Sequence, residues 1–265
     1  MFDVTKPIVM GIVNLTDDSF SGDGVAADVD AAVSQALRLK ADGASILDLG
    51  AESSRPGANA VSAEQEIQRL LPVVRALLDC GVALSIDTTK PEVMRAVLDA
   101  GADMINDINA LRAPGALEIL ASSKAGICLM HMQGTPGTMQ TAPSYADVVA
   151  EVAAFLKQRV SAVVAAGISP DRIAIDPGFG FGKTLEHNLA LLRHLYELHQ
   201  AETTMLVGIS RKSMLGALTG RPAGERTFAG LAAHVLAVQH GAQIVRTHDV
   251  AATRDALLVL AALEG

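Results

Sequence analysis

One arrangement of apolar and polar residues recurs along the chain. An amphipathic stretch ends in a glycine, and a short apolar run follows within a few residues, as at Gly43 before Ser45–Leu49 and at Gly81 before Ala83–Ile86. The glycine supplies the left-handed conformation that closes a helix, and a strand buried on both faces is a short, continuous apolar run. The pattern therefore predicts helices that alternate with the strands of a parallel sheet.

Eight apolar runs fit this pattern, and a candidate helix follows each of them. The predicted strands are Ile8–Val13, Ser45–Leu49, Ala83–Ile86, Met104–Ile105, Ile127–Met130, Ile173–Ile175, Met205–Val207 and Ile244–Val245. Eight such units predict a single-domain (β/α)8 barrel over residues 1–265. A doubly wound open sheet is the alternative, because alternation alone does not prove closure.

The stretches between the predicted strands carry helical periodicity. In Tyr145–Ala166, apolar residues such as Val152 and Leu156 recur at steps of three and four, which predicts an amphipathic helix whose apolar stripe packs on the core. Pro72 lies inside the candidate helix Glu64–Asp79, where it predicts a kink or a break.

Polar residues stand at the end of every predicted strand. They are Asn14, Asp48, Asp87, Asn106, His131, Asp176, Ser210-Arg211-Lys212, and Arg246 with His248. A single Asp at such a place is equally well explained as the N-cap of the next helix. In a parallel barrel, however, all these positions open onto one face, where catalytic groups gather. The sequence therefore predicts an active site at the carboxyl ends of the strands.

Composition narrows the classes of partner. The formal net charge is −8 and no run of Lys or Arg occurs, which argues against a nucleic-acid or anionic membrane partner and predicts a local cationic pocket for any bound anion. No apolar run is long enough for a membrane span and the start does not resemble a signal peptide, so we expect a cytoplasmic protein. Cys80 and Cys128 lack metal-ligand spacing and are expected to be core thiols.

A glycine-rich stretch at Gly178–Thr184 resembles the end of a phosphate-binding loop, but the required spacing fails. Pro177 stands where the first glycine is needed, and Lys183 stands where the dinucleotide motif requires its last glycine. We interpret the stretch as a shaped wall that presents Asp176 and one aromatic ring, Phe179 or Phe181. An ordinary glycine-rich connection is the alternative. Asp48–Gly57 is a second long polar loop, of the kind that carries function or disorder.

Taken together, eight segments resemble the motifs of the dihydropteroate synthase family, in order and at its spacing. They are Met10–Ser21, Asp48–Gly57, Ser85–Thr88, Ile105–Asp107, Leu129–Met132, Asp176–Lys183, Ser210–Ser213 and Arg246–Asp249. Each motif alone is weak, but the match runs from about Pro7 to the last helix.

The resemblance implies a transferase of folate biosynthesis, usually a homodimer. The implied reaction is a Mg2+-dependent condensation of 6-hydroxymethyl-7,8-dihydropterin pyrophosphate with p-aminobenzoate, which gives 7,8-dihydropteroate and pyrophosphate. Carried over to this sequence, the implied pterin site is Asp87, Asn106, Met130, Asp176, Phe181 and Lys212. The implied pyrophosphate site is Asn14, Arg246 and His248, with Asn14 also a Mg2+ ligand. The implied p-aminobenzoate site is Ser54, Arg55, Pro56, Phe181 and Ser213. Asn14, Arg55, Asp87, Lys212, Arg246 and His248 form the implied catalytic set.

The chain departs from the family pattern at several positions. Gly22-Asp23-Gly24 stands where the family usually has Asp-Gly-Gly, which displaces the carboxylate of that loop by one position. The Ser-Arg-Pro-Gly loop resembles the sulfonamide-sensitive form. Two other functions remain open at this point: a non-catalytic pterin-binding paralogue, and a pterin-dependent methyltransferase, which should lack the Ser210–Ser213 motif and the Arg246–His248 pair.

Overall fold

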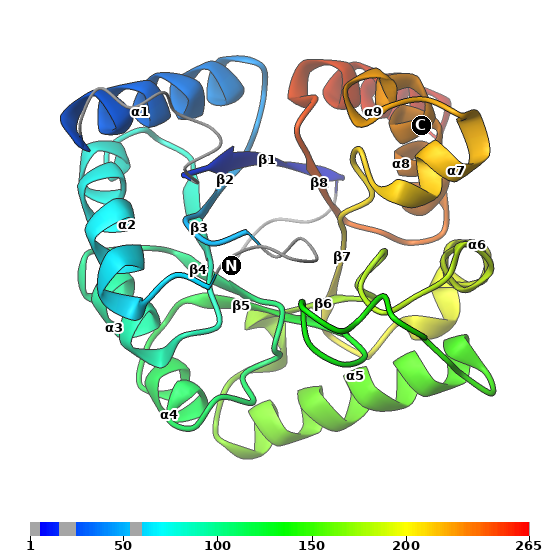
Figure 1. Cartoon of the computed structure of the whole chain (residues 1–265), viewed down its shortest axis with the longest axis horizontal. Helices are drawn as coiled ribbons and strands as arrows, with labels where there is room; N and C mark the ends of the chain where they lie inside the picture. The colour runs from blue at the N-terminus through cyan, green and yellow to red at the C-terminus, as the bar shows by residue number, and fades with distance from the viewer. Residues whose placement is uncertain (1–5, 16–24, 54–59, 265) are drawn as a thin grey trace.

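Eight parallel strands close into a barrel in a computed structural model that describes residues 6–15, 25–53 and 60–264. The strands follow one another around the barrel in chain order, and β1 pairs with both β2 and β8 (Figure 1). Pairing of Ile8 with Ile244 closes the sheet, so the open-sheet alternative is excluded. The fold is the predicted single-domain (β/α)8, or TIM, barrel.

The strands lie where the apolar runs predicted them, but most extend farther at their carboxyl ends. They are β1 (Ile8–Asn14), β2 (Ile46–Gly50), β3 (Ala83–Asp87), β4 (Met104–Asp107), β5 (Gly126–Met130), β6 (Ile173–Asp176), β7 (Thr204–Val207) and β8 (Ile244–Thr247). Asp87 pairs with Asn106, and Met130 with Asp176. Backbone pairing continues through polar residues because it does not depend on the side chain. Several candidate site residues therefore belong to the sheet rather than to loops.

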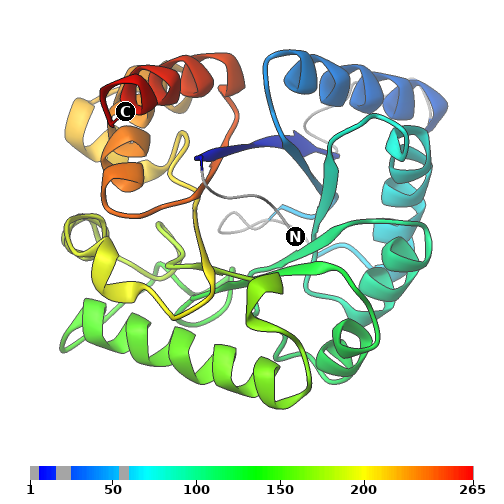
Figure 2. The same ribbon diagram turned by 180° about the vertical axis from the view of Figure 1, so that it is seen from behind.

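Helices surround the barrel on all sides (Figures 1 and 2). They are α1 (Val25–Ala41), α2 (Ala63–Leu77), α3 (Pro91–Asp99), α4 (Ala116–Ala121), α5 (Val148–Ala165), α6 (Leu185–Arg193), α7 (Ser213–Thr219), α8 (Thr227–Gln239) and α9 (Val250–Glu264), with short 3-10 turns at Pro170–Arg172, Leu195–Leu198 and Ala223–Glu225. Helix α5 matches its prediction, and α2 runs through Pro72 without a break. Within the described residues, no helix has the length and apolar character that crossing a bilayer requires.

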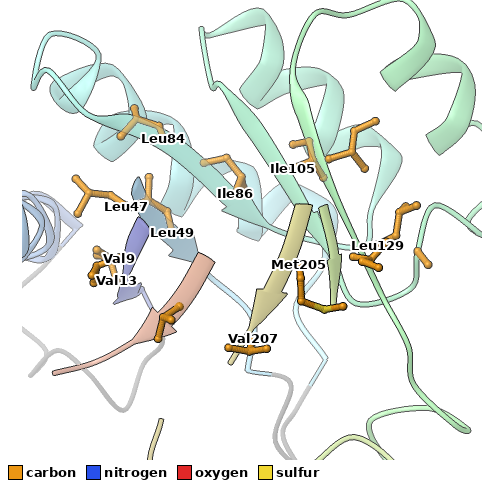
Figure 3. Packing of buried hydrophobic residues seen from close by; sticks show 14 of the residues in the cluster. Val9, Val13, Leu47, Leu49, Leu84, Ile86, Ile105, Leu129, Met205 and Val207 are labelled. Carbon is orange, nitrogen blue, oxygen red and sulfur yellow. The ribbon is translucent and has the colours of Figure 1, made fainter. Parts of the chain in front are cut away.

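Apolar side chains fill two layers. Inside the barrel, Ile8, Met10, Ile46, Met104, Cys128, Ala174, Leu206 and Ile244 form one buried cluster. A larger cluster includes residues on the other face of the strands and residues of the helices, and Figure 3 shows part of it, including Val9 of β1, Leu47 of β2 and Leu84 of β3. Cys80 and Cys128 are buried free thiols, as predicted. The barrel interior is thus a packed core toward the amino ends of the strands.

Candidate active site

Strand alternation carries polar side chains into the barrel at its carboxyl end. Successive strand residues face opposite sides of the sheet, so the residue two positions after an interior apolar residue also points inward. Asp48 follows Ile46 in this way, and Asn106 follows Met104. Ser85, Asp176 and Arg246 stand in the same relation to Ala83, Ala174 and Ile244. The polar layer of the site therefore rests directly on the apolar layer.

Asp48 is the centre of a buried network in this layer. Its side chain is fully buried and accepts hydrogen bonds from Ser85 Oγ at 2.6 Å and from Asn106 Nδ2 at 3.1 Å. Arg246 donates from Nε to Asp48 Oδ2 at 2.6 Å and from Nη2 to Asp87 Oδ2 at 3.0 Å. One guanidinium thus joins carboxylates from two strands. The sequence marked Asp48 only as a strand end; its two-residue offset from the apolar Ile46 was the signal that it points inward.

Burial governs the charges of this network. Desolvation raises the pKa of Asp87 to about 7, against the opposing attraction of Arg246, and the negative charge of Asp48 raises it further. Burial also disfavours the charged form of Arg246, but Asp48 and Asp87 outweigh it and raise the pKa of the guanidinium. The arrangement holds one permanent cation against two carboxylates, and Asp87 is poised between its charged and neutral forms near neutral pH.

The second half of the site lies around β6 and the segment after β7. Asp176 accepts a hydrogen bond from the Gly178 amide at 2.7 Å, and burial raises its pKa although Lys212 opposes the shift. Lys212 donates to the carbonyl oxygen of Phe179, and its Nζ lies 4.6 Å from the ring centre of Phe181. Burial lowers the pKa of Lys212 to about 8. This half combines an acceptor, a cation and an aromatic face.

An apolar patch adjoins the aromatic face. Met130 packs in a buried cluster with Ile108, Met132 and Met139, and Phe181 packs against that cluster. The structure therefore brings Met130 and Phe181 together, and their assignment to the pterin site stays a prediction. A flat ring lying here would meet thioether and aromatic surfaces, which adapt well to a planar ligand.

Lys183 fixes the shape of the glycine-rich segment from within. Its buried Nζ donates to the carbonyl oxygens of Gly178 at 2.9 Å and Phe181 at 3.0 Å, and it lies 2.9 Å from His131 Nδ1. Burial lowers the pKa of Lys183 to about 7 and, together with this lysine, lowers that of His131 to about 3. A neutral His131 can then accept from the lysine. The residue that resembled a phosphate-binding lysine is instead a structural support.

Gly178 shows how closely this segment approaches the sheet. Its φ is +70°, and a Cβ at this position would lie 1.9 Å from the carbonyl oxygen of His131. No side chain fits there. The two aromatic candidates differ in burial. Phe179 is completely buried in the core, whereas Phe181 is half-buried beside Lys212. Of the two rings, Phe181 is therefore the one that lies beside a candidate site residue, and the role of the segment as a wall of the site stays a prediction.

The remaining predicted residues fall into three groups. His248 lies after β8, with Nδ1 3.0 Å from Ser210 Oγ. Asn14 is the half-buried last residue of β1, and Ser213 is the exposed first residue of α7. The residues Ser54, Arg55, Pro56 and Asp23 lie outside the described residues, so their predicted roles stay predictions.

A hydrogen bond and two ion pairs hold the segments on either side of residues 54–59 in place. Glu52 accepts a hydrogen bond from the Val61 amide at 2.9 Å and pairs with Lys90 Nζ at 2.7 Å. Lys90 also pairs with Glu66, a buried residue of α2, at 2.6 Å. This cluster could not be predicted from local sequence patterns, because its members meet only through the packing of α2 beside α3.

Comparisons with known proteins agree with the geometry. The model of the pterin binding enzyme family matches residues 10–248. A dihydropteroate synthase of Neisseria meningitidis serogroup B is 53% identical in sequence, in an alignment that covers 97% of this chain and 93% of the relative.

Two solved structures are also similar. A dihydropteroate synthase of Yersinia pestis, with a sulfonamide drug complex, superposes with a TM-score of 0.94 at 46% identity and covers 99% of this chain and 96% of its own. A Xanthomonas albilineans dihydropteroate synthase with 4-aminobenzoic acid has a TM-score of 0.93 at 50% identity, covering 99% of this chain and 94% of its own.

The two phenylalanines of the glycine-rich segment should respond differently to truncation. We expect Phe179→Ala to lower the free energy of unfolding by about 3–5 kcal/mol, because the side chain is fully buried and leaves a cavity. Phe181→Ala should cost clearly less stability, because its side chain is only partly buried. Urea denaturation of both variants measures the difference. Equal losses would contradict the assignment of Phe179 to the core.

The Arg246 network predicts a pH-dependent stability effect. Burial raises the pKa of Asp87 to about 7, so folding favours its neutral form. That contribution is fully present below about pH 4 and is lost as the pH rises through about 7. Arg246 stabilises the ionised form, so Arg246→Met should cost about 3–5 kcal/mol near pH 8 and less near pH 5, where Asp87 is mostly protonated.

Denaturation of the Arg246→Met variant at both pH values measures this effect. Arg254→Met is the matched control, because its pair with Asp255 is exposed and should be worth less than about 1 kcal/mol at either pH. A loss in Arg246→Met that is the same at both pH values would contradict the argument.

Proposed function

The chain belongs to the dihydropteroate synthase family of pterin-binding enzymes, and from that premise we propose how its residues divide the work of the reaction. The enzyme condenses 6-hydroxymethyl-7,8-dihydropterin pyrophosphate with p-aminobenzoate to give 7,8-dihydropteroate and pyrophosphate. The observation that carries the assignment of roles is the set of acceptors and cations at the carboxyl face. Asn106 and Asp176 are buried, and Asp87, Lys212 and Arg246 are half-buried.

We assign pterin recognition to the acceptors of this set. A pterin presents a guanidine-like row of N–H donors, which matches buried carboxylate and amide oxygens such as those of Asp87, Asn106 and Asp176. Lys212 supplies a donor for the ring oxygen and N5, while Met130 and Phe181 provide the apolar contact. Because buried polar groups left unmatched cost free energy, a ring with a different edge binds poorly.

The guanidinium of Arg246 occupies part of the acceptor set that we assign to the pterin. It is bound to Asp87, a carboxylate of the same chemistry that the pterin edge requires. Arrival of the pterin donors at Asp87 would replace one of the two pairs of Arg246 and leave its Nε on Asp48. The freed donors of Arg246 would then serve the pyrophosphate oxygens, together with His248.

We propose Mg2+ as the cofactor of this leaving group. Among the residues that the structure describes, no three His, Cys, Asp or Glu side chains gather into a metal-binding group. Mg2+ prefers oxygen ligands and keeps several waters, so it can take phosphate oxygens and water as its main ligands and the Asn14 amide as the protein ligand. Bound Mg2+ would neutralise the charge of the departing pyrophosphate.

The protein itself orients the two substrates and excludes water. The amine nitrogen of p-aminobenzoate bonds to the methylene carbon of the pterin, the carbon–oxygen bond to pyrophosphate breaks, and the amine loses a proton. No covalent enzyme intermediate is required, so positioning and charge stabilisation do the work. We assign the second substrate to Ser54, Arg55, Pro56, Phe181 and Ser213, and we propose that sulfonamides bind at the same place.

The free thiols and the net charge of the chain bear on its cellular compartment and on its class of substrate. We propose that the enzyme works in the cytoplasm, which the two buried free cysteines support, because reducing compartments keep thiols unpaired. The net charge of −8 supports small-molecule substrates rather than nucleic acid.

Pyrophosphate release from the dihydropterin pyrophosphate tests the proposed function. We expect release only when p-aminobenzoate and Mg2+ are both present, with dihydropteroate as the product. A chelator should lower the rate by roughly a hundredfold, because metal stabilisation of a leaving group is worth several kcal/mol. Asp171→Ala, an exposed carboxylate on the 3-10 turn before β6, is a control that should leave turnover unchanged.

Other results of the same assay would contradict the proposal. Pterin binding without turnover would identify a non-catalytic binding protein, and methyl transfer from a methylated pterin would identify a methyltransferase. Full activity in the presence of chelator would remove the assignment of Mg2+.

We further propose a homodimer formed by helices α7, α8 and α9. Large apolar side chains stand exposed on these helices: Leu218, Phe228, Leu236, Leu258, Val259 and Leu263. The sequence of α8 is apolar around most of its circumference, as in helices buried on more than one face. Exposed apolar surface of this extent is typical of an interface.

Sedimentation analysis of two matched variants tests the dimer. We expect a mass of twice 27.5 kDa for the unaltered chain and a monomer for Leu236→Lys, because a charge would be buried in the interface. Leu37→Lys on α1 is the control, since Leu37 is 44% exposed and Leu236 is 46% exposed. A monomeric unaltered chain, or equal dissociation of both variants, would contradict the proposal.

A further inference from the structure

A chain of buried side chains connects helix α8 to His248. His234 Nδ1 on α8 lies 3.4 Å from Thr253 Oγ1 on α9, and Thr253 Oγ1 donates to Thr247 Oγ1 on β8 at 3.2 Å. Thr247 Oγ1 then donates to Ser210 Oγ at 3.5 Å, and Ser210 Oγ lies 3.0 Å from His248 Nδ1. We call these five residues the hydroxyl chain. His234, Thr253, Thr247 and Ser210 are all buried.

The backbone fixes the direction of the hydrogen bonds near His248. A hydroxyl has two acceptor sites and one proton. Thr247 Oγ1 accepts from the Asp249 amide at 3.1 Å and from Thr253, so its own proton is left to donate to Ser210. Ser210 Oγ accepts from Thr247 and from the His248 amide at 3.2 Å. Within the described part of the chain, both acceptor sites of Ser210 are therefore used, which leaves its proton for His248 Nδ1.

The far end of the chain agrees with this direction. Thr253 Oγ1 gives its proton to Thr247, so it can only accept from His234. Burial lowers the pKa of His234 to about 4, which keeps its ring neutral with a single N–H. His234 Nε2 has no hydrogen-bond partner among the described residues. Placing the proton on Nδ1 leaves an unpaired acceptor there instead of a buried unpaired donor, the less costly arrangement.

We propose that the hydroxyl chain sets the tautomer of His248, with Nδ1 as an acceptor and the proton on Nε2. When one ring nitrogen accepts a hydrogen bond, the neutral imidazole carries its proton on the other. Ser210 and Thr247 are then positioning residues for His248. The device makes His248 a donor through Nε2 even when the ring is neutral.

A donor at Nε2 suits the leaving group that the proposed function assigns to His248, and the inference rests on that function for its purpose. The oxygens of pyrophosphate accept hydrogen bonds and never donate when fully ionised. The opposite tautomer would present a lone pair to them. The chain therefore allows His248 to bind the anion without first taking up a proton, at a pH where a free imidazole is largely neutral.

Nuclear magnetic resonance of the imidazole nitrogens tests the tautomer directly. With 15N-histidine in the full-length chain at about pH 8, and His248 identified by its loss in His248→Gln, we expect Nδ1 without a proton and Nε2 with one. Thr247→Ser should keep this pattern because it retains the hydroxyl. Thr247→Val and Ser210→Ala should shift the ring toward the other tautomer.

Kinetics of the same variants test the consequence. Ser210→Ala should raise the KM for the dihydropterin pyrophosphate roughly tenfold, by analogy with the outer-shell partners of metal-ligating histidines. It should leave the KM for p-aminobenzoate unchanged. Thr247→Val should show a smaller rise and Thr247→Ser none. If Ser210→Ala does not fold, the Thr247→Val and Thr247→Ser pair decides.

A proton on Nδ1 of His248 in the unaltered chain would overturn the inference, as would a tautomer that neither Ser210→Ala nor Thr247→Val changes. Failure of the proposed function has a different signature. An unaltered chain that shows the expected tautomer but makes no dihydropteroate would overturn the function and leave the hydroxyl chain in place.

Discussion

The pairing of Arg246 with Asp48 and Asp87 is the interaction on which the open end of the barrel depends. Barrel closure forces every second strand residue inward, and above the apolar layer several of those residues are polar or charged. A carboxylate left alone there would be costly, and one guanidinium with rigid, forked donors satisfies two of them. The same pairing keeps both kinds of group at the open end of the barrel. The carboxylates are there to accept hydrogen bonds from a ligand, and the guanidinium is there to bind an anion.

The segments above the barrel are held by separate devices that share one principle. Lys183 ties the glycine-rich segment together through its carbonyl oxygens, and Lys90 ties both ends of the segment around residues 54–59 to α2 and α3. In each case an ammonium group is surrounded by acceptors inside the protein rather than offered to a ligand. The cations left for substrate are those on or beside the strand ends, such as Lys212, and a rigid sheet determines their spacing.

The sequence predicted the barrel because its signals are local. A glycine after a helix and an apolar run after the glycine, as at Gly81, need no knowledge of the rest of the chain. The candidate site followed from the shared end of the strands, and side chains such as Asp87 and Arg246 meet there. Three things could not be predicted: that Phe179 is core while Phe181 faces the site, that Lys183 turns inward, and that Asp48 binds Arg246 across the barrel. Each depends on contacts between residues 50 to 200 positions apart or on a backbone path that only the folded chain defines.

Long-range contacts also explain why two residues that are close in the chain, Arg246 and His248, can have different partners. Arg246 lies on β8 and His248 directly follows that strand, so position in the chain alone assigns both to the anion. Yet the side chain of Arg246 is held by carboxylates inside the barrel. The ring of His248 is instead held by hydroxyl groups that lead outward to α9 and α8. Its donor character is therefore controlled by the shell of helices rather than by the acidic layer.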